Sequence, residues 1–538
     1  MPLTIPPGWT LPLASQAPKM VLVTVNTHGR DPSDPDKPHL ALQPDSYTFC
    51  SHETVEVTDT RSGRTKPFWP WLQNGPTITY SFAPEDRRAE ISNTSLSVLA
   101  DAGLTAALRD VGGEQRATVR IDLWAKGIPL ENVFPLTAGI VTGMSDGERR
   151  TGPLTLTMTD GDPERQVQYP NDAMTLAEFP GAPYTVIENE YVPIIVGPFP
   201  QRHHCPQMDD TRRRFLIAGH ALTQKPTAVQ KGGTTVTSGW QVLPGKTATK
   251  QRDITYIEFT AKVDEIAAGV TDEVTCSGGV GRVDKNIVAL LCEIAGFRLS
   301  RRAQALLPQF DRDFPLSLEF SSPANVLDLL RQRILPQTGY VAYFRRNELD
   351  LIPLLGTVGE TRLGVGKGLL FRVPGQDGST PLSSVFNVIE VRCGRDMFAS
   401  SSSPVPLIRI RRDYNEGSPD IRALLDKSQA SAWGRRELPD AGKNFNDLAV
   451  LIDSNGNPTS CPGGQRIADL LARLHAFPHR TFSYATTWPM GMSVDLNDRV
   501  LLTDPDENLA DEPTRVVQVA YGPTGTTVQF QTEDAGLS

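Results

Sequence analysis

The sequence has no long hydrophobic run and few of the short motifs that carry chemistry. No run of about 18 apolar residues occurs, so no membrane-spanning helix is expected. Its first residues, MPLTIPPGWTLPL, contain neither a basic segment nor a long apolar core, so we expect no signal peptide. HExxH and SxxK are both absent, as is the phosphate-binding pattern GxxxxGK followed by Ser or Thr. These absences exclude several common hydrolase and nucleotide-binding classes.

Neither sign of charge dominates, and cysteine is sparse. The chain has 53 Lys and Arg against 62 Asp and Glu, a net charge of −9, which argues against a dedicated nucleic-acid binder. The basic run Arg212–Arg214 is expected on a solvated strand edge or at a subunit contact. No CxxC pair occurs, which argues against a zinc ribbon and a disulfide framework and predicts free thiols in a reducing cytoplasm. The six cysteines are Cys50, Cys205, Cys276, Cys292, Cys393 and Cys461.

What the sequence does contain is many short strands. Gly and Pro number 44 each and are dispersed along the chain, as in a protein with many turns. The segment 117–124 alternates apolar and polar residues with a period of two, and 134–143 and 152–162 follow at short intervals. This pattern predicts an antiparallel meander that curls into a sandwich or barrel.

The fold class is predicted as mainly β, with two antiparallel barrel-like domains flanking an α+β insertion. The polar, Pro-rich start has one clear strand at 20–26 and too little apolar surface to fold alone. The closing strands 152–162 and 525–536 look loosely alike, which raises the alternatives of an internal repeat or a coincidence of β composition. The expected divisions are an arm at 1–74, a first barrel at 75–266, the insertion at 267–385 and a second barrel with one helix (about 464–477) at 386–538.

The insertion is predicted to hold two helices and a hairpin. A helix over 284–296 would begin at Asp284 as its N-cap and end at Gly296. A second would be capped by Ser322, with Pro323 at its first position, and stopped by Pro336. The residues 338–354 then read as two strands joined by a polar turn. The second of the two predicted helices carries an apolar stripe, which comprises Val326, Leu327, Leu330 and Ile334.

Candidate metal and nucleophile sites are few. His203, His204 and Cys205, followed by Asp209 and Asp210, form the best metal candidate. Adjacent strand residues point to opposite faces, so a surface turn or a subunit contact is the favoured interpretation.

Two further patterns favour structural roles. The stretch CSGGVG at 276–281 is interpreted as a glycine turn, because it lacks the GK[ST] ending of a phosphate loop and has no nearby partner for a Cys nucleophile. The acidic clusters at 158–164 and 504–508 do not follow the spacing of a calcium loop, so solvated hairpin tips are expected. The aromatic segment at 68–71 could equally plug a core or anchor a neighbouring subunit.

The C-terminal half resembles the baseplate hub proteins of bacteriophage tails, whose relatives include the hub part of type VI secretion spikes. In such hubs a Tyr-Gly or Trp-Gly pair leads to a helix and then to a barrel, and the middle strand of the barrel reads small residue, acid, any residue, Val. Here SQASAWGRREL at 428–438, the helix at 467–477 and the strands of 480–534 match that order. The residues Leu496–Val500 take the place of the strand motif, with Asn497 where Gly is commoner. The segment 323–354 resembles the inserted domain of these hubs.

The resemblance implies a non-enzymatic structural protein of the virion tail baseplate, assembled in the host cytoplasm. It implies a homotrimer, in which each subunit supplies two tube-type barrels to a six-fold ring. Implied partners are distal tail and tail tube proteins, a central fibre or spike, and the tape measure protein. DNA would pass through the channel without specific binding, which suits an acidic chain. No catalytic residue, cofactor, metal or stable membrane anchoring is expected.

Two alternatives stay open. One is a distal-tail or fibre-carrying adaptor of the baseplate. The other is a virion-associated cell-wall hydrolase, which would need two carboxylates or a Cys/His pair brought within reach of each other by the fold.

Overall fold

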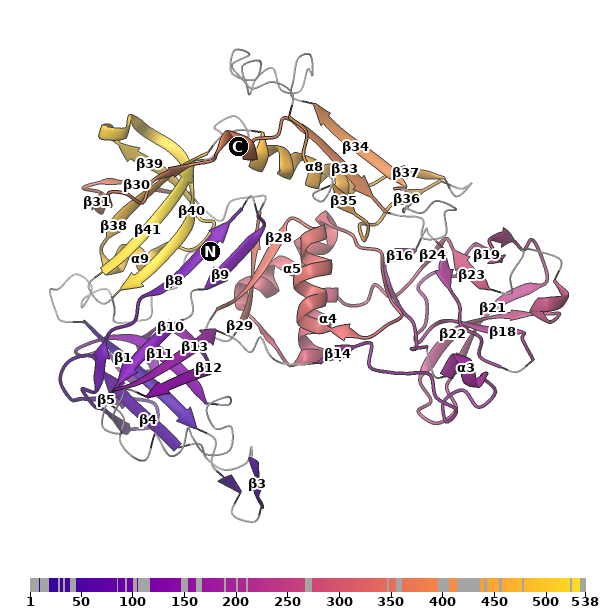
Figure 1. Cartoon of the computed structure of the whole chain (residues 1–538), viewed down its shortest axis with the longest axis horizontal. Helices are drawn as coiled ribbons and strands as arrows, with labels where there is room; N and C mark the ends of the chain where they lie inside the picture. Colours follow the sequence, from indigo (N-terminus) through magenta and orange to yellow (C-terminus); the bar gives the residue numbers. More distant parts are fainter. Residues whose placement is uncertain are drawn as a thin grey trace.

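The computed structural model is a mainly β protein in which two barrel-like sheets are joined by helices and smaller sheets (Figure 1). This confirms the expected fold class. The structure describes residues 9, 19–27, 30–31, 34–38, 45–84, 86–91, 94–99, 104, 117–146, 153–160, 167–187, 190–199, 202–209, 211–266, 273–345, 348–354, 360–394, 406–413, 436–439, 443–453, 457–476, 479–522 and 525–532.

The first barrel is a seven-stranded sheet in the order β4-β1-β11-β12-β13-β10-β7. In β11 the alternation buries Val119, Ile121 and Leu123, as the sequence predicts. Its strands are β1 (Lys19–Thr27), β4 (Asp45–Cys50), β7 (Leu72–Asn74), β10 (Thr94–Val98), β11 (Thr118–Ala125), β12 (Phe134–Asp146) and β13 (Leu154–Asp160).

The aromatic segment at 68–71 closes this barrel between β4 and β10. The N–H of Cys50 donates to the carbonyl of Trp69 at 2.7 Å, and the N–H of Trp69 donates to the carbonyl of Thr48 at 3.3 Å. The carbonyl of Trp71 accepts the N–H of Leu99 at 2.8 Å, and β7 goes on to pair with β10. The strands β1, β4 and β7, which the sequence assigns to a separate arm, are therefore barrel strands. Their partners lie far along the chain, and composition alone does not reveal such pairing.

A hairpin leaves the first barrel and joins the second. It consists of β8 (Ile78–Ala83) and β9 (Arg88–Ile91). β8 pairs with the last part of β40 (Leu509–Gly522), with Ser81 opposite Gln518 and Ile78 opposite Tyr521. The chain then returns to the first barrel at β10, so the two sheets share this hairpin (Figure 1).

The second barrel closes on itself because β41 pairs with both β38 and β40. The remaining order around the ring is β38-β31-β30-β39-β40. Two of its strands, β30 and β31, come from the segment that the sequence assigns to the insertion. Its further strands are β30 (Glu360–Val365), β31 (Gly368–Arg372), β38 (Arg480–Thr486), β39 (Arg499–Asp504) and β41 (Gly525–Thr532).

The two barrels share the order of four consecutive strands. In the first, β11, β12 and β13 form a meander and β10 pairs with β13; in the second, β39, β40 and β41 form a meander and β38 pairs with β41. The register of each closing hairpin shifts at a bulge, at Val141–Gly143 in β12 and at Val516–Gln518 in β40. The two closing strands that look alike in sequence, β13 and β41, therefore occupy equivalent places.

A separate β unit follows the first barrel, where the sequence predicts a continuation of it to residue 266. Its main sheets are β18-β22-β21 and β17-β23-β19-β20. It has apolar clusters of its own, one of them around Phe215, Ile257 and Phe259. The principal elements are α3 (Tyr184–Ile187), β17 (His203–His204), β18 (Arg214–Ala218), β19 (Ala228–Lys231), β20 (Thr234–Thr235), β21 (Trp240–Lys246), β22 (Asp253–Phe259) and β23 (Val274–Ser277).

The insertion contains the expected hairpin and two helical stretches, but both helices begin later than predicted. Asn286, not Asp284, caps α4 (Ile287–Ala295) by accepting the N–H groups of Val288 and Ala289. Asp284 is paired instead with Arg282 at 2.8 Å. Gly296 ends α4 in the left-handed conformation, as predicted.

The second helix is capped by Asn325, because Ser322 and Pro323 precede a short strand, β27 (Ala324–Asn325). It runs as α6 (Val326–Asp328), a π-helical turn η4 (Leu329–Ile334) and a 3₁₀ turn η5 (Leu335–Gln337). The predicted stripe on it is buried. The hairpin follows as β28 (Tyr340–Arg345) and β29 (Glu348–Pro353).

Two longer helices lie elsewhere in the described part of the chain, and a short one, α9 (Trp488–Ser493), precedes β39. α5 (Arg301–Asp313) was not predicted, because it contains Pro308 and many charges. The predicted C-terminal helix is α8 (Pro462–His475), which packs on the sheet of β33 (Val388–Cys393) and β34 (Ile408–Asp413). No helix within the described ranges is long and apolar enough to cross a bilayer.

Candidate functional site

The most elaborate site in the described structure is the junction where the two barrels and the insertion meet. Tyr80 of β8 lies at its centre. Its hydroxyl donates to the carbonyl of Leu136 in the first barrel at 2.6 Å. Its ring packs edge-on against Tyr343 of the insertion at 6.4 Å and against Tyr521 of the second barrel at 6.2 Å. One buried side chain therefore contacts all three parts of the molecule.

Two arginines and two aspartates form a buried ionic cluster beside Tyr80. Arg302 of α5 binds Asp350 at 2.8 Å and Asp495 at 3.1 Å. Arg345, at the end of β28, pairs with the other oxygen of Asp495, and its guanidinium lies 5.0 Å from the centre of the Tyr80 ring. All four side chains are at most 13% exposed. Asp495 belongs to the second barrel, so these contacts fix that barrel to the insertion.

Each charge in the cluster is compensated by an opposite charge. Burial by itself would raise the pKa of Asp495, but the charges of Arg345 and Arg302 outweigh it and lower the pKa to about 2. The pKa of Arg345 is raised in turn, because the carboxylate of Asp495 outweighs the effect of burial. Asp350 also accepts the hydroxyl of Ser300. The cluster is a closed set of ion pairs, which can hold elements together.

The turn that presents Asp495 is the segment that matches the hub motif. Asn497 has φ of 66°, the left-handed region where glycine is favoured and asparagine is tolerated. Its side-chain amide donates to the carbonyl of Pro353 in the insertion. The carboxylate of Asp498 accepts the N–H of Asp495 at 2.7 Å, which tightens the turn. The left-handed backbone conformation explains why residue 497 can be Asn, at a position where the resembling hubs more often have Gly.

The carboxyl of Asp498 is expected to make stability depend on pH. Burial first, and the charge of Asp495 second, raise its pKa to about 7 from an ordinary value of 3.8. Between about pH 4 and 7 the folded protein holds a proton there that the unfolded chain releases. The resulting stabilisation is complete below about pH 4 and is lost as the pH rises through 7, roughly 4 kcal/mol at most.

The variant Asp498→Asn should therefore weaken the fall in stability between pH 5.5 and 8.5. Urea unfolding at the two pH values measures it, with Asp506→Asn as the control because Asp506 is exposed. If the pH dependence of stability is the same in Asp498→Asn as in the unmodified chain, the carboxyl of Asp498 is not its source.

His203 and Glu319 make a second buried contact, between the separate β unit and the insertion. The Nδ1 of His203 lies 2.9 Å from Glu319, and its Nε2 lies 2.8 Å from the carbonyl of Ile217. Burial would lower the pKa of His203, but the charge of Glu319 outweighs it and raises the pKa to about 9. Both ring nitrogens are donors in this state, so His203 serves as a cation.

In the metal candidate at 203–205, the two histidines lie in β17 and contact different groups. His204 points to Glu190 at 3.8 Å and Glu273 at 3.5 Å, away from the Glu319 contact of His203. Asp209 accepts backbone N–H groups from Arg213 and Arg214, and Asp210 lies outside the described residues. Within the described ranges no group of three or more His, Cys, Asp or Glu could hold a metal ion.

The glycines of CSGGVG serve close packing. A Cβ on Gly281 would lie 2.3 Å from the carbonyl oxygen of Ile195, and one on Gly278 would lie 2.1 Å from the hydroxyl of Thr227. Cys276 is buried, with its sulfur 3.5 Å from that of Cys205. All six cysteines are buried and free, in agreement with the predicted thiols.

One pattern of a serine nucleophile does occur, GMSDG at 143–147. The catalytic form needs a sharp turn between a strand and a helix. Ser145 instead lies within β12 and pairs with Thr155 of β13. The pattern is thus part of the barrel wall; Gly147 lies outside the described residues.

Other sequence candidates are structural too. In the acidic cluster at 504–508, Asp506 is exposed in the turn between β39 and β40, whereas Asp504 is buried and accepts the hydroxyl of Tyr484 at 2.6 Å. Glu507 pairs with Arg372 and Arg480. Asp160 is likewise buried, whereas 161–166 lie outside the described residues.

The basic run and the aromatic segment lie at edges of the β structure. Arg214 begins β18, an end strand of its sheet, and pairs with Glu258 at 2.7 Å. In the aromatic segment Phe68 is buried, while Trp69 is 43% exposed and stacks on Trp71 at 5.8 Å.

Comparisons with solved structures identify similar tail and baseplate proteins. The 43 kDa tail protein of prophage MuSo2 from Shewanella oneidensis has 8% identity and a TM-score of 0.37, with 90% of this chain and 100% of that chain covered. The phage P2 baseplate in its activated conformation has 8% identity and a TM-score of 0.22, covering 95% of this chain and 98% of that chain. The Francisella PdpA–VgrG complex has 6% identity and a TM-score of 0.34, covering 96% of this chain and 53% of that chain.

These are the classes of protein that the C-terminal motifs resemble. No family model matches the chain, and no curated protein matches its sequence.

The residues that hold the junction were not predicted as a site. The available signal was charge placed inside apolar strands: Arg345 ends the buried run of β28, and Asp350 lies between Leu349 and Leu351. Asp495 directly precedes the motif at 496–500, and its spacing in the sequence does not reveal its distant partners Arg302 and Arg345. The Trp433-Gly434 pair, which also carries the resemblance, lies outside the described residues.

Proposed function

We propose that the chain is a structural subunit of a bacteriophage tail baseplate. It acts as a hub that joins the tail tube to a central tip or fibre and lines the channel for DNA, without catalysing a reaction. The observation that carries the proposal is the strand order shared by β10–β13 and β38–β41. Two equivalent barrels in one chain allow three copies to present six similar units.

The junction supports the same function. A ring that continues a six-fold tube with three subunits needs both barrels of each subunit held at a fixed spacing. The shared β8–β9 hairpin, Tyr80 and the cluster around Asp495 supply that fixed connection. The insertion, attached to both sides, would bridge neighbouring subunits or meet the central fibre or spike.

Assembly on a tail tube tests the proposal. The chain is mixed with tube protein, a distal tail protein and a tape measure protein, and particles are imaged by electron cryomicroscopy. The expected result is a homotrimer of the 58.8 kDa chain with six barrels around an open channel at the end of the tube. A ring of another symmetry, or a chain that stays monomeric on the tube, would overturn it.

A zymogram on bacterial cell wall tests the absence of catalysis. The purified chain should leave the cell-wall substrate intact. A cleared zone at the position of the chain would favour the hydrolase alternative and contradict a purely structural function.

A further inference from the structure

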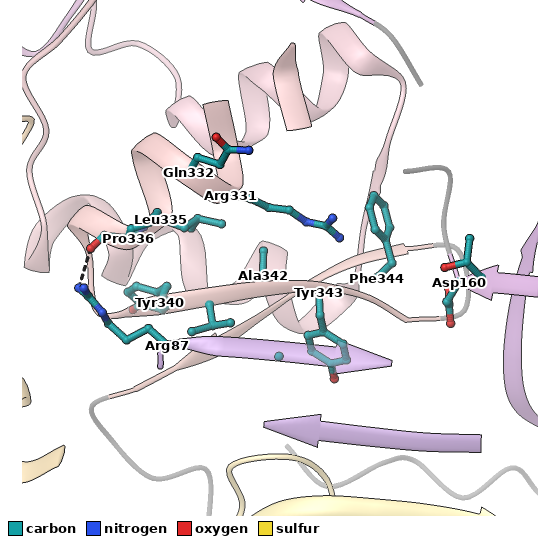
Figure 2. A pocket seen from close by; sticks show the side chains of 13 residues that line it. Arg87, Asp160, Arg331, Gln332, Leu335, Pro336, Tyr340, Ala342, Tyr343 and Phe344 are labelled. Atoms are coloured by element: carbon teal, nitrogen blue, oxygen red, sulfur yellow. Dashed lines mark hydrogen bonds between the residues drawn. The ribbon is translucent and has the colours of Figure 1, made fainter. Parts of the chain in front are cut away.

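A cavity of about 480 Å³ lies between the insertion and the first half of the chain (Figure 2). Its walls come from η4 and η5, from β28, from the β8–β9 hairpin and from the end of β13. It adjoins the ionic cluster at Asp495 through Tyr343, which lines the cavity and whose hydroxyl accepts a hydrogen bond from Arg302 at 3.1 Å. Its apolar lining includes Leu335, Val341, Ala342 and Phe344.

Two arginines bring positive charge to this cavity. Arg331 extends from η4, with its guanidinium 5.5 Å from the centre of the Phe344 ring. Among the described residues it makes no ion pair or hydrogen bond; part of its side chain is exposed, and the protein atoms around the rest lower its pKa by displacing water. The nearest acid in sequence, Asp328, acts on Arg331 only through its charge, which opposes the effect of burial on the pKa, and its carboxylate accepts the amide of Gln332 at 2.9 Å.

Arg87 is the second positive group. It lies in a turn with φ of 53°, and its guanidinium donates to the carbonyl of Pro336 at 2.8 Å. A carbonyl is a neutral partner, and burial lowers the pKa of Arg87 as well. The acid that lines the cavity, Asp160, accepts the hydroxyl of Thr137 at 2.8 Å. The lining therefore contains two guanidinium groups and one carboxylate, which gives it an excess of positive charge.

We propose that this cavity binds a short peptide segment of a partner protein that carries a carboxylate side chain between apolar residues. The carboxylate pairs with Arg331, whose planar guanidinium suits bidentate contact with a carboxylate. The flanking apolar side chains lie against Leu335, Val341 and Phe344. A segment bound there touches the insertion and the β8–β9 hairpin together. This inference stands independently of the hub function.

The chemistry of the walls selects this ligand. A free phosphate could pair with the guanidinium groups, but it would leave the apolar side chains of Leu335, Val341 and Phe344 without a contact. A purely apolar segment would leave the charge of Arg331 without a partner at the mouth of the cavity, where Arg331 and Gln332 are exposed. A segment with one carboxylate between apolar residues can pair with Arg331 and at the same time contact the apolar side chains of the lining.

Two matched peptides test the proposal on the full chain. The probes are acetyl-Leu-Glu-Leu-amide and acetyl-Leu-Gln-Leu-amide, which differ only in the charged group, titrated at millimolar concentration by saturation-transfer NMR. The Glu peptide should bind about tenfold more tightly than the Gln peptide, because a hydrogen-bonded ion pair replaces a neutral contact. Arg331→Gln should reduce this preference to twofold or less, and Arg331→Lys should retain part of it.

Arg301→Gln is the matched control, because Arg301 is an exposed arginine of the same insertion that does not line the cavity. It should leave the preference unchanged. Equal affinity for the two peptides, no binding of either, or a preference that survives Arg331→Gln would each overturn the proposal. Unchanged thermal unfolding of Arg331→Gln shows that a loss of binding is not a loss of fold.

Discussion

Replacing Asp495 by Ala is expected to destabilise the chain by about 3 to 5 kcal/mol, because two buried arginines lose their shared carboxylate. Arg345 is 7% exposed and has Asp495 as its ion-pair partner, while Arg302 keeps Asp350. The second barrel should then unfold before the insertion, so scanning calorimetry should show two transitions at separate temperatures.

Asp284→Ala is the matched control for that experiment. Asp284 forms an ion pair with Arg282 at 2.8 Å, but its side chain is 65% exposed, so the loss should be below about 1 kcal/mol. The double variant Arg345→Met with Asp495→Leu should recover most of the stability lost in Asp495→Ala, since no charge is then left unpaired at that position. Equal effects of Asp495→Ala and Asp284→Ala would show that the cluster does not hold the junction.

Tyr80→Ala is expected to cost about 3 to 5 kcal/mol, the usual range for removing a large buried aromatic side chain. The loss has two parts that Tyr80→Phe separates. The Phe variant keeps the contacts with Tyr343 and Tyr521 but removes the hydrogen bond to Leu136, for a cost of about 1 kcal/mol. Urea unfolding monitored by tryptophan fluorescence measures the stability of both the Ala and the Phe variant.

Tyr184→Ala provides the control for Tyr80, because Tyr184 is 66% exposed and should change stability by less than about 0.5 kcal/mol. The Tyr80→Ala variant should also lose the threefold particle on the tail tube, since the two barrels would no longer keep their spacing. If Tyr80→Ala unfolds like the unmodified chain, Tyr80 is not the link between the three parts.

Local patterns in the sequence predicted the elements well, and long-range pairing poorly. The strands at 117–124 and 134–143, the hairpin after Thr338 and the helix expected at about 464–477 are all confirmed, with the helix observed at Pro462–His475. Each of these is encoded by its own periodicity and turn residues. The assignment of β1 to an arm and of β30 to the insertion differs from the structure, because their partners β11 and β39 are chosen by tertiary packing.

The site was harder to predict for a related reason. Asp495, Arg345 and Arg302 come from three separate segments, and an ion pair between distant residues leaves no spacing pattern in the chain. The caps show the same limit on a smaller scale. Asn286 and Asp284 are both acceptable caps by type, and the pairing of Asp284 with Arg282 decides between them.

The shared β8–β9 hairpin affects how the protein folds during its synthesis. A ribosome adds about 5 to 20 residues per second, so β40 emerges roughly 20 to 90 seconds after β8, its partner. Until then β8 has an open edge, and the ring of the second barrel does not exist. The nascent chain must keep this edge from pairing with other chains for that whole interval, which makes its early half a natural client for a chaperone.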